Sequence, residues 1–170
     1  MEAKEMPCRI VRRLAVDEAA YLAGLIDGEG TVTMSRLHAR DRRQLIVSIS
    51  STEPGILGWV RQTVGAGKVT RKRVASVRHA PGLTFTAANR QALDLLGQTA
   101  MYLRSYKRMR AELALAKYVA TTPRNGRYSP ETARLRDEFE STILALHPAE
   151  RRVRPELRRP ATVAQGAMLV

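Results

Sequence analysis

The chain has 170 residues, the size of one domain with a hydrophobic core of its own. Its 29 lysines and arginines outnumber 16 acidic residues, and the formal net charge of +13 favours a nucleic-acid partner over the alternative, an anionic membrane surface. No run of 18 apolar residues occurs, which excludes a membrane-spanning helix. The single cysteine, Cys8, forms no internal disulfide and no signal-peptide pattern opens the chain, so we expect a cytoplasmic protein.

Hydrophobic periodicity and turn residues predict alternating helices and strands. The first helix is expected at about residues 17–28, with Asp17 as its N-cap and Gly30 at a positive φ at its end. The later elements are expected as strands at 31–37 and 45–49, a helix at 53–64, strands at 68–74 and 83–86, and helices at 89–98, 107–119 and 129–146. This order predicts an α+β fold whose antiparallel sheet carries its helices on one side.

Caps and flanking segments complete this description. Asn89 and Ser129 are the expected N-caps of the third helix and the last helix, and Gly65 is expected to end the second helix. We place the domain at residues 17–147, between a basic lead-in at 1–16 and a flexible basic tail at 148–170.

The most informative segment is residues 22–30, which read Leu-Ala-Gly-Leu-Ile-Asp-Gly-Glu-Gly. Gly24 and Gly28 lie four residues apart on one face of the predicted helix, so a second helix can approach that face closely. Each glycine in a helix costs roughly 0.5–1 kcal/mol relative to alanine, which argues against an ordinary core helix. Glu29 is then held at the end of a closely packed helix pair.

This segment resembles the signature of the LAGLIDADG homing endonucleases, with Gly28 where the family name has alanine and Glu29 where it has aspartate. The predicted order of elements is also similar to the family's αββαββα unit with additional C-terminal helices, whose sheet forms a concave DNA-binding saddle. Members with a single motif act as homodimers, so the resemblance implies a two-fold dimer in which this helix contacts its own copy. The residues expected in the dimer interface are Leu22, Ala23, Gly24, Ile26 and Asp27.

The resemblance implies a site-specific endonuclease, encoded in an intron or intein, that cleaves double-stranded DNA at a long pseudo-palindromic target and leaves 3′ overhangs. Its partners are then DNA and a second copy, without a membrane or a small-molecule cofactor, and an organelle becomes an alternative location to the cytoplasm. Two other functions stay open: a catalytically inactive DNA-binding regulator with this fold, and an intron RNA maturase. The acidic Glu29 favours the nuclease, because a binding protein does not need it.

Hydrolysis of a phosphodiester is assisted by divalent metal ions that carboxylates hold. The resemblance assigns Glu29 and the carbonyl group of Gly28 to a Mg²⁺ or Mn²⁺ site, and gives Asp27 hydrogen bonds around the helix ends instead of a catalytic role.

Two further positions are candidates for the reaction. Lys107 is expected near the attacking water, with three rivals for this role, Arg104, Arg108 and Arg110. The family often has a glutamine at the end of the second strand, where this chain offers Ser50, Ser51 or Thr52, and Ser51 is our candidate for a catalytic contact.

DNA contacts are expected on one face of the sheet, because side chains alternate along a strand and a two-stranded ribbon fits the major groove. The residues expected on this face are Thr31, Thr33 and Ser35 of the first strand, Gln44, Ile46 and Ser48 of the second, Lys68, Thr70 and Lys72 of the third, and Thr84 and Thr86 of the fourth. Arg40, Arg42 and Arg43 of the hairpin loop are expected to reach phosphates or outer bases, and Arg71 and Arg73 to lie at the sheet edge.

Overall fold

The structure, a computed structural model, describes residues 10–71 and 82–147. Its elements are α1 (Val16–Glu29), β1 (Gly30–Ser35), β2 (Gln44–Ser51), α2 (Pro54–Val64), β3 (Lys68–Arg71), β4 (Leu83–Ala88), α3 (Asn89–Thr99), the 3₁₀ helix η1 (Ala100–Tyr102), α4 (Lys107–Lys117) and α5 (Pro130–Ala145). The predicted order of helices and strands is confirmed. Residues 72–74 of the third predicted strand lie outside the described residues.

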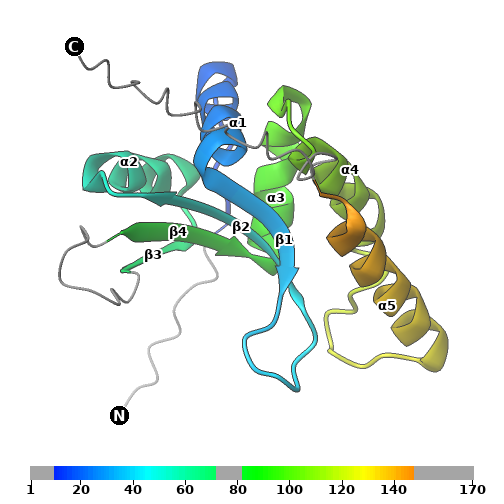
Figure 1. The fold of residues 1–170 in the computed structure, drawn as a ribbon. Helices are drawn as coiled ribbons and strands as arrows, with labels where there is room; N and C mark the ends of the chain where they lie inside the picture. Colours follow the sequence, from blue (N-terminus) through cyan, green and yellow to red (C-terminus); the bar gives the residue numbers. More distant parts are fainter. Residues whose placement is uncertain (1–9, 72–81, 148–170) are drawn as a thin grey trace, which may run out of the picture.

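The four strands form one open antiparallel sheet in the order β1-β2-β4-β3. Figure 1 shows that β1 bends along its length and that the helices gather on one side of the sheet. The predicted α+β class, with helices on one side of the sheet, is therefore confirmed. None of the described helices is long and apolar enough to cross a membrane.

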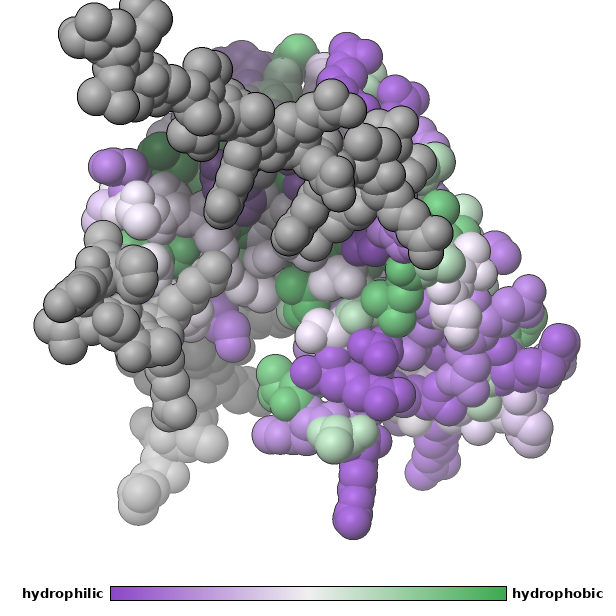
Figure 2. Space-filling view, viewed as in Figure 1, coloured by the Kyte–Doolittle hydropathy of each residue, from purple (hydrophilic) through white to green (hydrophobic). Residues whose placement is uncertain are grey.

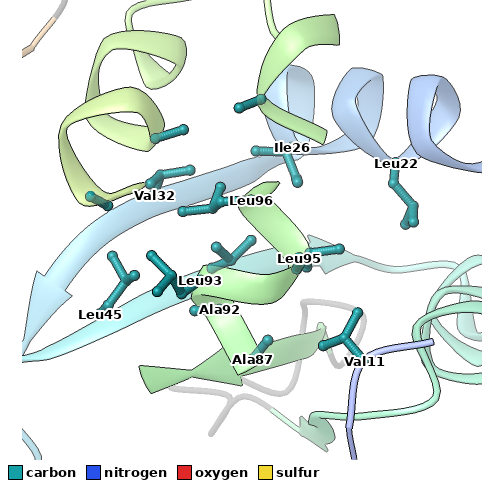
Figure 3. Close-up of a cluster of buried hydrophobic side chains, with 14 of the residues drawn as sticks. Val11, Leu22, Ile26, Val32, Leu45, Ala87, Ala92, Leu93, Leu95 and Leu96 are labelled. Atoms are coloured by element: carbon teal, nitrogen blue, oxygen red, sulfur yellow. The ribbon is translucent and has the colours of Figure 1, made fainter. Parts of the chain in front are cut away.

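The core lies between the helices and one face of the sheet. Alternate strand residues are buried on that face, and they include Val32, Val47 and Phe85. Figure 3 shows Leu22 and Ile26 projecting from α1 toward the cluster that α3 completes with residues such as Leu95 and Leu96. Because one face of the sheet is covered in this way, its other face is left to the polar side chains that the alternation predicted.

The segment before α1 is part of the domain. Val11 is buried in the core, and the backbone N–H of Arg12 donates to the carbonyl oxygen of Val64 over 2.9 Å. The side chain of Gln98 accepts from the N–H of Leu14 and donates to the carbonyl oxygen of Arg12. The domain boundary at residue 17 stays a prediction, and these contacts precede it; they join residues far apart in sequence and leave no periodic pattern.

The structure confirms the predicted helix ends at Ser129 and Gly65. It corrects those at Asp17, Asn89 and Gly30, the last of which is described with the candidate site. Ser129 caps α5 by accepting from the N–H of Thr132, and Gly65 ends α2 at a φ of 70°. Asp17 lies inside the first turn of α1, where the carboxylate of Glu18 accepts from the N–H of Ala15 instead.

Asn89 is likewise not an N-cap. Ala88 occupies the N-cap position of α3, while Asn89 has a φ of 54° and its side-chain oxygen accepts from the hydroxyl of Tyr118. Asparagine tolerates this left-handed conformation better than most residues, which explains its place here without a capping role.

Candidate functional site

The candidate site is built around the junction of α1 and β1. Gly30 passes directly from helix to strand with a φ of −106°, so the predicted positive φ is wrong. A Cβ atom at Gly30 would lie 2.6 Å from the Cα atom of Ile26 and 2.8 Å from the carbonyl oxygen of Ser48. Glycine is therefore required by close packing of the backbone, and Glu29 is held, exposed, just before the edge strand β1.

Lys107, the first residue of α4, lies against the end of α1. Its Nζ atom donates to the carbonyl oxygens of Ile26 and Asp27, both at 2.8 Å, and its side chain is buried. The Ile26 carbonyl also accepts from the N–H of Gly30, whereas the Asp27 carbonyl belongs to the last turn, whose carbonyl groups lack a helical partner. The structure thus brings Lys107 to the same helix end as Glu29, as the prediction for the site requires.

The charge of Lys107 is set by opposing effects. Burial lowers the pKa of its ammonium group below the usual range. The carboxylates of Asp27 and Glu29 act against this, since they favour the charged form, and the nearby Arg110 adds to the lowering.

Asp27 faces the loop before α4. Its carboxylate accepts from the N–H groups of Arg104 and Ser105, and from the Ser105 hydroxyl at 2.5 Å. Partial burial alone would raise the pKa of Asp27, but the hydrogen bonds from Ser105 and Arg104 and the charge of Lys107 outweigh it, and the pKa is lowered. Asp27 thus ties the loop to α1, as expected from its predicted role in hydrogen bonding.

The three rivals of Lys107 have other surroundings. Arg110 is buried and donates to the carbonyl oxygens of Val32 and Leu146. Arg108 pairs with Glu112 one turn along α4, and the side chain of Arg104 is exposed. Of the four candidates, Lys107 is the one whose side chain bonds to the last turn of α1.

Ser51 is not placed as predicted. Its hydroxyl accepts from the N–H of Glu53 at the start of α2, and alternation puts it on the face of β2 that the core covers. Ser50 lies on the polar face and hydrogen-bonds to Thr84 over 3.0 Å. Gly30, which follows Glu29, pairs with Ile49, which precedes Ser50. The alternation from Ser48 to Ser50 was the signal that favoured Ser50.

The predicted DNA-facing residues meet on the uncovered face of the sheet. One row crosses all four strands through Thr31, Ser48, Thr86 and Lys68, which pair in register. A second row joins Ser50, Thr84 and Thr70, and the remaining predicted residues of this face are Thr33, Ser35, Gln44 and Ile46. All of them are exposed or half-buried, whereas their strand neighbours on the other face are packed in the core.

The basic residues of the hairpin loop divide into two groups. Arg40 is exposed, while Arg42 pairs with Asp137 and lies over the ring of Tyr128. Arg43 is half-buried beside Glu140, and its contact with DNA stays a prediction. Figure 2 shows hydrophilic residues gathered over the hairpin and α5. Arg71 is exposed on the edge strand β3, and Lys72 and Arg73 lie outside the described residues.

The predicted dimer interface needs correction. Leu22, Ala23 and Ile26 are completely buried in the chain's own core, so they are not available to a partner. The exposed face of α1 carries Gly24 and Gly28 instead, and a Cβ atom at either position would meet no described residue within 4 Å. Sequence spacing identified both apolar residues and glycines, but the packing of α1 decides which of them face outward.

Among the described residues, no group of three or more His, Cys, Asp or Glu side chains is arranged to hold a metal ion. From one chain, the oxygen donors at the end of α1 are the Glu29 carboxylate and backbone carbonyl groups such as that of Gly28.

Comparison with solved structures relates this geometry to known folds. The homing endonuclease I-CvuI, in complex with its target in the presence of calcium, superposes with a TM-score of 0.63 at 20% sequence identity, over 81% of this chain and 87% of that chain. The archaeal intron-encoded homing endonuclease I-Vdi141I, complexed with DNA, gives 0.53 at 12% identity, over 79% and 86%. The I-SmaMI LAGLIDADG homing endonuclease bound to cleaved DNA gives 0.53 at 14% identity, over 80% and 47%.

The fold is that of the LAGLIDADG homing endonucleases. The resemblance predicted from residues 22–30 is thus confirmed for the fold. Comparison with protein-family models finds no match, and comparison of the sequence with curated proteins finds none either. The chain matches most of I-CvuI but about half of I-SmaMI, so one LAGLIDADG unit of this size leaves room for a second in the longer chain.

Proposed function

We propose that this chain is a site-specific, double-strand DNA endonuclease of the LAGLIDADG type that acts as a homodimer with a divalent metal ion. The observation that carries the proposal is that Glu29 is exposed at the end of α1, immediately before β1, with Lys107 bound to the same helix end. A nuclease needs a carboxylate and a cation next to its DNA-binding surface, whereas a DNA-binding regulator does not.

The donors at this helix end suit Mg²⁺ or Mn²⁺. The Glu29 carboxylate and the Gly28 carbonyl are hard oxygen ligands, and Mg²⁺ is usually held by one or two carboxylates together with waters and phosphate oxygens. One chain supplies one such pair, and a two-fold partner would bring a second. When bound, the metal supplies charge neutralisation at the phosphate and a water of lowered pKa.

Lys107 has a donor left for the reaction. An ammonium group has three N–H donors, and two of those of Lys107 go to the carbonyl oxygens of Ile26 and Asp27. The third can be directed to a phosphate oxygen or to the attacking water. A cation that is already oriented by the protein stabilises charge developing on the phosphate without reorganisation, and we assign this role to Lys107.

The homodimer is supported by the outer face of α1. Within the described residues, a Cβ atom at Gly24 or Gly28 would meet nothing within 4 Å, so no contact there offsets the cost of these glycines in helix stability. One turn before Gly24, the ring of Tyr21 is 52% exposed and lies edge-on to Trp59 at a centroid distance of 5.0 Å. The two rings line an open groove of about 320 Å³, and exposed aromatic residues beside a helix face are typical of a protein interface.

A two-fold dimer would place two copies of the polar sheet face along one DNA duplex. We therefore propose a long pseudo-palindromic target whose half-sites are read by the rows through Ser48 and Thr84. Cleavage with 3′ overhangs, an origin in an intron or intein, and a location in the cytoplasm or an organelle belong to the same proposal, as do DNA and a second copy as partners.

The decisive experiment is cleavage of a randomised library of DNA targets with Mg²⁺, followed by the same assay on Glu29→Gln. The variant keeps the shape of the side chain but removes the charge, so we expect DNA binding without cleavage. Glu138→Gln, on the exposed side of α5, is the matched control and should cleave as the wild type does.

Three results would contradict the proposal. Cleavage by Glu29→Gln at the wild-type rate would show that this carboxylate is not a metal ligand. Specific binding by the wild type without any cleavage would favour a DNA-binding regulator, and preferential binding of structured RNA would favour a maturase.

A further inference from the structure

A buried ionic cluster connects α5 to the base of the β1–β2 hairpin. Its members are Arg43, Arg136 and Glu140, which we call the hairpin brace. The Nη2 atom of Arg136 donates to the carbonyl oxygen of Arg43 over 2.6 Å, and its Nε atom donates to Glu140 over 3.0 Å. The other carboxylate oxygen of Glu140 lies 3.6 Å from the Nε atom of Arg43. The brace thus holds the backbone and the side chain of one hairpin residue.

The contacts of the brace reach both strands of the hairpin. Arg43 directly precedes β2, and its guanidinium donates to the carbonyl oxygen of Met34 in β1. Arg136 also donates to the hydroxyl of Thr122 in the connection between α4 and α5. In Figure 1 the hairpin extends from the lower end of β1 and β2, with α5 beside it. The brace therefore joins the hairpin to two segments of the helical layer.

The burial of these charges points to a role in positioning. Arg136 is 1% exposed, its guanidinium lies over the rings of Tyr118 and Phe139, and Glu140 is 8% exposed. Buried ion pairs contribute little net stability, because desolvation offsets their attraction, and apolar residues of similar size often serve as well. What such a cluster adds over apolar packing is a defined geometry, since each charged hydrogen bond has a preferred length and direction.

The hairpin is where such geometry matters. Arg36 and Arg40 are exposed in the loop between β1 and β2, beyond the last paired residues of the sheet. The direction in which the loop leaves the sheet decides which part of a DNA duplex these side chains reach. An exposed pair between Arg42 and Asp137 adds a second tie between the loop and α5.

We propose that Arg136 is a positioning residue: through Glu140 and Arg43 it sets the angle of the β1–β2 hairpin and so determines which outer base pairs of a DNA half-site are read. This proposal rests on the proposed function. Arg136 itself is buried and does not touch DNA; its effect passes through the backbone of Arg43.

The test compares Arg136→Met with Arg134→Met, which removes an exposed arginine from the same helix. In the free protein, hydrogen exchange of the amides at 34–35 and 44–45, which pair across the hairpin base, should be about tenfold faster in Arg136→Met and unchanged in Arg134→Met. Exchange in the centre of β2 and β4 should stay as in the wild type.

The second readout is base preference in the cleaved library. Arg136→Met should lose about tenfold in discrimination at the outer positions of each half-site, while the central positions keep theirs. A merely destabilised protein would lose discrimination at all positions. If Arg136→Met does not fold, Glu140→Gln, which keeps size and acceptor, should show the same pattern more weakly.

The outcomes separate the two proposals. Unchanged exchange at the hairpin base would overturn the brace, whether or not the protein cleaves DNA. Faster exchange with unchanged outer discrimination would overturn its role in recognition. If the wild type neither binds nor cleaves DNA, the proposed function fails, and with it the recognition role, whereas faster exchange would still support the mechanical brace.

Discussion

Substitution of Gly24 by alanine should stabilise the single chain and weaken its association with a second copy. Among residues 10–71 and 82–147, nothing lies within 4 Å of a Cβ atom placed at this position. Gly24→Ala therefore adds helix propensity without a clash, and the free energy of unfolding of the monomer should rise by about 0.5–1 kcal/mol. For a chain of this size, the melting temperature should rise by about 1–4 °C.

In contrast to the monomer, the dimer should become less stable in Gly24→Ala. Across a two-fold axis the substitution places two methyl groups in a seam that glycine had left free. Overpacking of this kind costs about 1–3 kcal/mol, which weakens association by roughly 5- to 150-fold. Cleavage should fall accordingly at protein concentrations near the dissociation constant of the wild type.

Thermal unfolding at a concentration where the chains are monomeric measures the first effect, because the stability of a dimer depends on concentration. Sedimentation equilibrium measures the second. Gly97→Ala in α3 is the matched control, since its Cβ atom would make an ordinary contact with Leu115 at 3.8 Å, and it should stabilise the monomer without weakening the dimer. The reasoning is refuted if both variants behave alike in sedimentation, or if Gly24→Ala destabilises the monomer.

Three other predictions concern packing, pH and salt. Gly30→Ala should destabilise the fold by about 3 kcal/mol, because the new Cβ atom would lie 2.6 Å from backbone of Ile26; chemical denaturation at the wild-type midpoint would contradict this. The pKa of Asp27 is lowered by folding, so its stabilising contribution is complete above its ordinary pKa of about 3.9 and is lost as the pH falls through its lower folded pKa. The difference in unfolding free energy between wild type and Asp27→Asn should therefore narrow below about pH 4. A difference that stays constant on acidification would contradict a stabilising role of the Asp27 carboxylate. With a net charge of +13 per chain, log K for DNA should fall with log salt at a slope of about −6 to −10, and a slope near zero would argue against phosphate binding.

The sequence by itself determined the features that depend on neighbouring residues. Alternation along Thr31, Val32 and Thr33 separates the two faces of β1, because successive side chains of a strand point in opposite directions. The two ends of α2, at Pro54 and Gly65, also depend on local sequence, since proline restricts its own backbone angles and glycine permits a positive φ. The order of elements follows from such patterns, and with residues 22–30 it was enough to predict the fold.

Tertiary structure decided which groups of this fold meet. Lys107 reaches carbonyl groups about 80 residues earlier in the chain, and Arg136 captures the carbonyl group of Arg43 across 93 positions. In the same way, packing against α3 and the sheet turned Leu22 and Ile26 inward and left Gly24 outward. Every residue has a backbone carbonyl group, so the amino-acid sequence does not show which one accepts a side-chain hydrogen bond. Which face of a helix is buried depends on the elements that pack against it, so both features are determined by tertiary packing.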